Sequence, residues 1–199
     1  MKKTILFVCI LCAAHSAVAQ SYTLKNGDFE NGIFEKNSRN ASGIENWYWQ
    51  ASQEKVPGST IELVSTEKHQ GNKSVKITAT GEIAARYYVT LIKKLGIVSK
   101  LNYTFTFWAK SNTDVKLNCN FDGFCLKEGV STKTGTPGDV ITISGNNKWK
   151  KYTLVLKGKT FSNFSSFDFT QPANFNLGLE KQNISENLEL YIDDLELLD

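Results

Sequence analysis

The chain has 199 residues and carries 23 lysines and arginines against 20 aspartates and glutamates, for a formal net charge of +3 at pH 7. Lys2 and Lys3 supply most of that excess, so the rest of the chain is close to neutral and lacks the clustered basic surface typical of nucleic-acid binding. After the amino terminus no stretch approaches the ~20 apolar residues that a membrane-spanning helix needs, so no membrane span is expected.

Residues 1–19 have the pattern of a secretory signal peptide. Two lysines precede an apolar run over residues 5–14, and the small residues at 17–19 form a cleavage site. We therefore expect residues 20–199 to be secreted, periplasmic or at the cell surface after cleavage near Ala19. Their length suits a single domain with a substantial core, and the sequence leaves the oligomeric state open.

The stretch 24–32 places one large apolar side chain, Phe29, between the carboxylates of Asp28 and Glu30. In a strand, Phe29 would point to one face and the two carboxylates to the other. The best pairing partner is the last apolar run, residues 188–198, which carries an acidic pair of its own. We predict that the two ends of the chain meet and that a metal ion lies between their acidic side chains.

Alternation with a period of two dominates the rest of the chain and predicts an all-β domain. No helix of ordinary length with an apolar stripe is apparent. We expect a two-sheet antiparallel β-sandwich, although alternation does not distinguish a jelly roll from an immunoglobulin-like order. The expected strands lie at 61–64, 74–79, 83–92, 101–110, 114–121, 140–143, 149–156, 175–179 and 188–198.

The aromatic residues divide by their phase within these strands. One group is in phase with apolar neighbours and is expected in the core: Trp47, Tyr103, Phe105, Phe107 and Tyr152. Arg86, Tyr88 and Trp108 fall out of phase and are expected on an outer surface. For Trp108 a second interpretation remains open, in which the Phe- and Ser-rich segment 160–175 covers it.

Cys119 and Cys125 are the two cysteines outside the leader. A three-residue hairpin loop at 121–123 would put Gly123 at the position that requires positive φ and set the cysteines opposite each other. In an oxidising compartment this arrangement predicts a structural disulfide.

The motif Asn26-Gly-Asp-Phe-Glu30-x-Gly32 resembles the opening N-x-x-F-E-x-G of carbohydrate-binding modules of families 4, 9 and 22. Five further segments resemble these modules in the same order, at 46–47, 69–77, 103–110, 149–152 and 191–195, and together they cover nearly all of the chain after the leader. The resemblance implies a galactose-binding-domain-like jelly roll and a non-catalytic function in binding a poly- or oligosaccharide. It also implies that Trp149 occupies a structural position, so Trp149 is expected in the core.

The resemblance also implies a structural calcium ion that joins the chain ends. Glu30 resembles the side-chain ligand of the family and Asp193 the C-terminal one, while backbone carbonyls near Asp28 and in the turn from Lys68 to Asn72 would complete an oxygen shell. In the alternative interpretation these carboxylates are solvated or hold a local turn.

The expected glycan surface combines aromatic rings, which stack on sugar faces, with planar polar groups that bind hydroxyls. Its candidate residues are Tyr48, Arg86, Tyr88, Trp108, Asn118 and Asn120. Two alternative functions remain, a jelly-roll glycoside hydrolase and an adhesion domain for a protein partner. His69 is the only histidine after the leader, which disfavours a histidine-rich zinc site.

Overall fold

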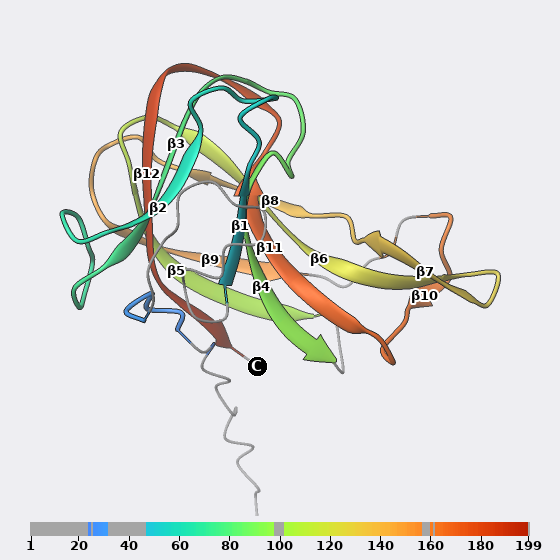
Figure 1. The fold of residues 1–199 in the computed structure, drawn as a ribbon. Coiled ribbons are helices and arrows are strands. Elements are labelled where there is room, and N and C mark those ends of the chain that lie inside the picture. The colour runs from blue at the N-terminus through green and yellow to red at the C-terminus, as the bar shows by residue number, and fades with distance from the viewer. Residues whose placement is uncertain are drawn as a thin grey trace, which may run out of the picture.

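The computed structural model describes Leu24 and residues 26–31, 47–97, 102–156, 160 and 162–198. These residues form two antiparallel β-sheets packed face to face, so the predicted β-sandwich is confirmed (Figure 1). The predicted signal peptide lies outside the described residues. Within the part that is described, no helix is both long and apolar enough to cross a membrane.

The two sheets differ in size and in shape. The five-stranded sheet has the order β2 (Thr60–Val64), β3 (Ser74–Ile83), β12 (Gln182–Leu198), β5 (Tyr103–Ser111) and β9 (Lys150–Leu156). The seven-stranded sheet has the order β1 (Trp47–Ala51), β4 (Val89–Ile97), β11 (Pro172–Leu179), β6 (Val115–Lys127) and β10 (Ser166–Phe167). Two further strands, β7 (Val130–Gly135) and β8 (Asp139–Ile143), also pair with β6.

The core forms where the inward faces of the two sheets meet. Phe105 of β5 and Phe175 of β11 stack across the sandwich with ring centroids 4.1 Å apart, and both are fully buried. Trp47, Phe107 and Tyr152 are also buried, as the phase of their strands predicts. Burial of large aromatic rings at this junction makes it a main source of stability.

Trp149 is the exception among the aromatic residues predicted in the core. It precedes β9 and is half-buried, and its ring contacts those of His69 and Tyr191. Tyr191 belongs to β12, where the neighbouring Leu190 and Ile192 both pack in the core cluster. Trp149 therefore lies outside the core, over the outer face of the five-stranded sheet, and the prediction was wrong for this residue.

The single strand expected at 83–92 is in fact two strands. β3 ends at Ile83 and β4 begins at Val89, and residues 84–88 form a turn between them. Alternation would place Tyr87 on the same face as the buried Val89 and Leu91, but Tyr87 is 59% exposed in this turn, whereas Tyr88 packs partly against the core. The residues of the turn continue the alternation of β3 and β4 by chance, so the sequence gives no sign that the strand is interrupted.

The hairpin expected at 121–123, and with it the disulfide, is also wrong. β6 runs without interruption from Val115 to Lys127, and Cys119 and Cys125 are buried free thiols on this one strand. An extended strand separates residues six positions apart by roughly 20 Å, whereas a disulfide requires Cα atoms within about 7 Å.

Gly123 has a packing role in place of the expected turn role. A Cβ atom at this position would lie 2.7 Å from Cζ of Phe167, so glycine allows the Phe167 ring to approach β6. The chain reverses instead at Glu128 and Gly129, whose φ angles are +51° and +79°. Positive φ at both central residues is the mark of a tight two-residue hairpin turn.

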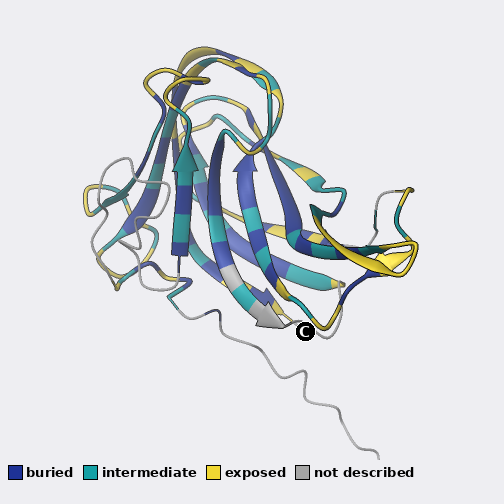
Figure 2. Cartoon of the chain, turned by 45° about the vertical axis from the view of Figure 1, so that its right-hand side comes forward, coloured by how far each residue is buried: buried dark blue, intermediate teal, exposed yellow. Residues whose placement is uncertain are grey.

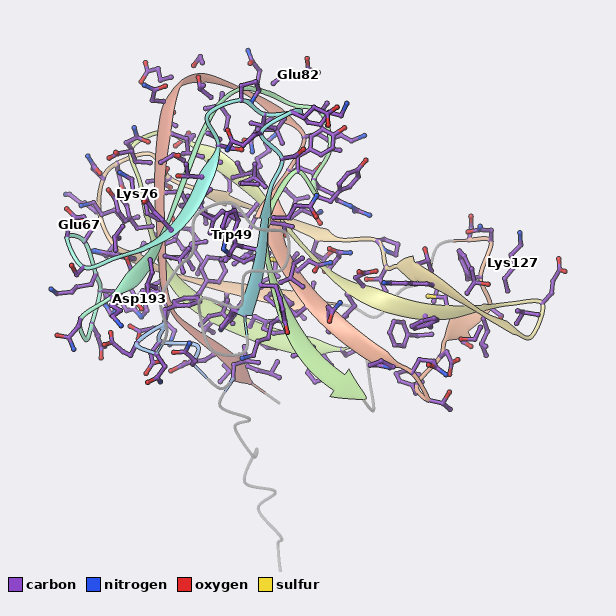
Figure 3. The ribbon with its side chains drawn as sticks, in the orientation of Figure 1. Trp49, Glu67, Lys76, Glu82, Lys127 and Asp193 are labelled. Atoms are coloured by element: carbon purple, nitrogen blue, oxygen red, sulfur yellow. The ribbon has the colours of Figure 1, made fainter. Side chains whose placement is uncertain are left out.

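The far half of β6 and its partner strands extend the seven-stranded sheet beyond the sandwich (Figure 1). We call this extension the arm and define it as residues 122–135 together with β10. Lys127 marks its tip, far from the body of the molecule (Figure 3). β7 is largely exposed along its length, whereas Cys125 and Phe167 are buried where β10 pairs with β6 (Figure 2).

We predict that Phe105→Ala lowers the free energy of unfolding by about 3–5 kcal/mol, because it removes one ring of the stack that joins the sheets. Chemical denaturation measures this change. Val155→Ala is the matched control, since Val155 lies on β9 of the same sheet and is 49% exposed. Equal losses for the two variants would contradict the assigned core.

We also predict that Cys119 and Cys125 remain reduced in the folded protein. Burial raises the pKa of both thiols, and well above its usual value for Cys119, so both should resist alkylation until the chain unfolds. Peptide mapping after labelling with and without denaturant tests this. Recovery of a Cys119–Cys125 cross-linked peptide, or a lower Tm in reductant, would show the strand assignment to be wrong.

Candidate functional site

The outer face of the seven-stranded sheet carries a group of neutral polar side chains on neighbouring strands. The even-numbered residues of β6 point to this face because the odd-numbered ones pack in the core. Pairing aligns Asn120 with Asn176 of β11, Asn176 with Ile92 of β4, and Ile92 with Tyr48 of β1. We call this surface the amide face: Tyr48, Ile92, Asn118, Asn120, Asp122, Asn174 and Asn176.

Two side-chain oxygens of the amide face are buried without a hydrogen-bond donor. Among the described residues, none donates to Oδ1 of Asn118 or to Oδ1 of Asn176. The Nδ2 atom of Asn176 lies 3.4 Å from Oδ1 of Asn120, and Nδ2 of Asn120 donates to the Phe121 carbonyl. A buried acceptor without a donor costs on the order of 1–3 kcal/mol. Such groups are uncommon in folded proteins, and a bound ligand can relieve their cost.

Glycine residues allow two other backbone segments to approach the edges of the amide face. A Cβ atom on Gly178 would lie 2.7 Å from the Arg86 carbonyl oxygen, so the 84–88 turn lies directly over β11 at this end. A Cβ atom on Gly138 would lie 2.3 Å from Oδ1 of Asn118, so the segment after β7 runs beside Asn118. These two segments border the face at one end and along one side.

The charge on the amide face is low. Asp122, half-buried beside Asn174, is the one carboxylate in this set, and burial raises the pKa of its carboxyl group above the usual value. The other polar members are carboxamides and one phenol, which donate and accept hydrogen bonds without a formal charge.

Of the six ligand residues predicted from sequence, three belong to the amide face: Tyr48, Asn118 and Asn120. Arg86 and Tyr88 lie in the turn that borders it, and the Tyr88 carbonyl accepts a hydrogen bond from the backbone of Ser52. These five residues are therefore associated with one sheet, although Asn118 and Asn120 are more buried than an open binding surface would suggest.

Trp108 does not join them, because β5 belongs to the five-stranded sheet. Its ring stacks on the imidazole of His69 with centroids 3.7 Å apart and an interplanar angle of 13°. Nδ1 of His69 lies 2.7 Å from Oδ2 of Asp194, which fixes the ring in this position. The predicted combination of Trp108 with Tyr88 and Asn118 is therefore wrong. His69 covers one face of Trp108, and the strands described within 160–175, β10 and the start of β11, belong to the other sheet.

A second cluster lies where the two ends of the chain meet, as predicted. The backbone N–H of Leu195 donates to the Gly27 carbonyl at 2.9 Å, and Phe29 is fully buried against Trp47. The segment is a turn rather than a strand, since Asn26 and Phe29 have φ angles of +56° and +55°. The chain ends thus meet as predicted, whereas the strand expected at this segment is wrong.

At this seam two carboxylates hold one turn from its two ends. Oε1 of Glu30 accepts hydrogen bonds from the backbone N–H groups of Asn72 and Lys73, at 2.6 and 2.9 Å. Oδ2 of Asp193 accepts from those of His69 and Gln70, at 2.9 and 3.3 Å. The turn is therefore tied both to the beginning of the chain and to β12.

The remaining predicted calcium ligands, Asp28, Lys68 and Asn72, are less favourably placed to bind an ion. Asp28 is exposed, and its Oδ1 lies 3.5 Å from the backbone nitrogen of Glu30. The Lys68 side chain donates to the Ser65 carbonyl, and Asn72 donates to Glu30 through its side chain as well as its backbone. The described residues contain no group of three or more histidine, cysteine or acidic side chains suited to a metal ion.

The Asp193 carboxylate nevertheless lies in an unfavourable electrostatic position. Burial and, to a smaller extent, repulsion from Asp194 raise its pKa to about 6, although hydrogen bonds from three backbone N–H groups act against this rise. A bound cation would favour the ionised form of this group. Glu30 and Asp193 both offer carboxylate oxygens, which are the ligands calcium prefers, so their chemistry fits such an ion.

Sequence analysis missed the other four members of the amide face, Ile92, Asp122, Asn174 and Asn176. The signal for the first part of β6 was present, because residues 114–122 alternate. The Asp122-Gly123 pair masked it by resembling a hairpin turn. Asn176 could not have been placed beside Asn120, because pairing of β11 with β6 is a long-range property of the fold.

No protein-family model and no curated protein matches the sequence. Solved structures do match. A family 4 carbohydrate-binding module is 14% identical, with 88% of this chain and 99% of that chain covered and a TM-score of 0.52. A protein from Bacteroides thetaiotaomicron, provisionally described as sugar-binding, is 18% identical over 89% of this chain and 99% of that chain, with a TM-score of 0.60.

The chain has the jelly-roll fold of carbohydrate-binding modules. A further match, a carbohydrate-binding module of the β-sandwich superfamily, is 14% identical over 85% of this chain and 64% of that chain, with a TM-score of 0.50. At these identities the similarity concerns the fold, and the resemblance implied by the motifs is confirmed at that level.

Proposed function

We propose that this protein is a non-catalytic carbohydrate-binding module whose site is the amide face. The observation that carries the proposal is the alignment of Tyr48, Asn176 and Asn120 in one cross-strand row on the outer face of the seven-stranded sheet. Sugar hydroxyls are both donors and acceptors, and carboxamides supply both functions at a single planar group. A rigid strand holds these groups in fixed positions, which reduces the entropy cost of binding.

The buried oxygens of Asn118 and Asn176 support this proposal. Because neither has a described donor, the free protein bears their desolvation cost. Asn176 as a whole is only half-buried, so a small rotation of its side chain brings the amide to the surface. A ligand hydroxyl that donates to this oxygen then supplies the missing hydrogen bond.

The chemistry of the amide face favours binding over hydrolysis. A glycoside hydrolase uses two carboxyl groups, one as acid and the other as base or nucleophile, at a set separation across the bond that is cleaved. The amide face carries a single carboxyl group, Asp122, and its carboxamides do not carry out such proton transfers at neutral pH. The fold is also that of modules known as carbohydrate-binding, including the family 4 module and the superfamily module.

We further propose that calcium binds at the seam, held by Glu30 and Asp193. When bound, the ion would neutralise the buried Asp193 carboxylate and would add a link between the N-terminal turn and β12. The support for this proposal is the raised pKa of Asp193 at a point where both ends of the chain supply acidic oxygens. This seam lies away from the arm, on the other side of the molecule (Figure 3).

Binding to a panel of neutral polysaccharides, measured by affinity electrophoresis and isothermal titration calorimetry, tests the first proposal. We expect Asn176→Ala to weaken binding about three- to tenfold, as befits the loss of one neutral hydrogen bond. Asn183→Ala is the matched control, because Asn183 is an exposed amide on β12 of the other sheet.

Three outcomes would contradict this proposal. Unchanged binding by Asn176→Ala and Tyr48→Ala would place the site elsewhere. Release of reducing sugar by the wild-type protein would support the hydrolase alternative. Absence of binding across the panel would favour an adhesion domain with a protein partner.

For calcium, we expect a chelator to lower the Tm of the wild-type protein by several degrees, because an ion bound to the folded state stabilises it by mass action. Glu30→Gln and Asp193→Asn should have a lower Tm than wild type and should not respond to the chelator. Glu186→Gln, an exposed change on β12, should respond as wild type does. If the chelator does not change the Tm of the wild-type protein, the calcium proposal is wrong and hydrogen bonds alone hold the seam.

A further inference from the structure

The amide face continues onto the arm through Phe124. Phe124 follows Asn118, Asn120 and Asp122 at the next even position of β6, so it points to the same side of the sheet. Its ring is half-buried, whereas the odd-numbered neighbours Gly123 and Cys125 are buried on the opposite side. From Asn118 to Phe124 the strand spans roughly 20 Å, which is several pyranose rings in length.

Polar groups lie on both sides of Phe124 along this line. On the side of the sandwich are Asp122 and its pairing partner Asn174. On the side of the arm tip, Oγ of Ser131 donates to Oδ2 of Asp168 at 2.6 Å, which links β7 to the segment after β10. The backbone N–H of Asp168 donates to the Phe124 carbonyl, so this link lies next to Phe124.

The borders of the amide face favour extension in this direction. The 84–88 turn lies over β11 near Gly178, and the segment containing Gly138 runs beside Asn118. Backbone therefore borders a ligand bound to Asn118, Asn120 and Asn176 at the end of the amide face that is farther from the arm. Along β6 toward Phe124 the alternation continues, while the partners of β6 change from β8 and β11 to β7 and β10.

We infer that Phe124 forms an additional sugar-binding subsite on the arm, so that the protein binds an extended neutral polysaccharide along its length rather than only its terminal sugar. This inference rests on the proposed function of the amide face. The Phe124 ring would stack on the apolar face of a sugar, and the neighbouring polar groups would hydrogen-bond to the hydroxyls at its edge. The arm thereby determines how many sugar units the site holds.

The test uses cello-, xylo- and β-1,4-galacto-oligosaccharides from disaccharide to hexasaccharide, with affinity measured by calorimetry for each length. In the wild-type protein we expect the affinity to rise through the series that binds. Phe124→Ala should weaken hexasaccharide binding about fivefold and leave disaccharide binding unchanged, so that the dependence on length becomes flatter. Phe124→Tyr should retain the wild-type dependence on length, because it keeps the ring.

Val130→Ala is the matched control, since Val130 is a 65% exposed apolar residue near the tip of the same arm. Thermal denaturation confirms folding of each variant. Phe124→Leu serves if Phe124→Ala is unstable, because it keeps an apolar side chain without the ring.

Different results overturn the inference and the function on which it rests. If Asn176→Ala weakens binding but Phe124→Ala and Phe124→Leu do not, the amide face binds sugar and the subsite on the arm is wrong. A loss by Phe124→Ala that is equal at every length would also overturn the subsite. If the wild-type protein binds none of the three series and no polysaccharide of the panel, the proposed function itself fails.

Discussion

The structure depends on the unbroken extension of β6 through thirteen residues. This strand alone pairs with β7, β8, β10 and β11, so it fixes the register of most of the seven-stranded sheet. Its odd-numbered side chains fill the core and its even-numbered ones form the amide face. A shift of one residue would exchange these two sets and would expose the core to solvent. The core therefore enforces the position of every group in the candidate site.

Much of the fold could be predicted because alternation is a local property. The clearest strand, Tyr103–Ser111, and the burial of Phe105 and Phe107 follow from the period of two alone. The motif around Phe29 also indicated correctly that the chain ends meet. These features share one cause, which is that each side chain's environment is determined by its phase within a few neighbouring residues.

The errors arose where a local signal competed with long-range packing. Asp122-Gly123 has the composition of a hairpin turn, but the fold uses the missing side chain of Gly123 to seat Phe167, which lies far away in the sequence. The turn at 84–88 was hidden for the opposite reason, because its residues continued the alternation by chance. The predicted position of Trp108 was wrong for a third reason. Phase within a strand predicts that a side chain points outward, but not which sheet contains the strand.

The candidate site illustrates the same limit. Asn118 and Asn120 could be selected from sequence as outward-pointing amides of one strand. Asn176 could not, since only the pairing of β11 with β6 brings it to Asn120. A binding surface assembled across strands is a product of topology, so its members are distributed over the sequence without a common motif.

In the proposed function, the seam contributes to stability and the amide face to recognition. At the seam, charged oxygens accept hydrogen bonds from a single backbone turn and hold the chain ends together. On the amide face, uncharged amides lie on strands, and part of their hydrogen-bonding capacity is left unused within the protein. An unpaired charge is far more costly to bury than an unpaired neutral amide oxygen, which costs on the order of 1–3 kcal/mol. A surface intended for sugar hydroxyls benefits from the second arrangement, because the ligand is uncharged and must replace water with comparable hydrogen bonds. For the proposed site, a rigid β6 would limit the conformational entropy lost on binding, so that individually weak contacts could sum to a measurable affinity.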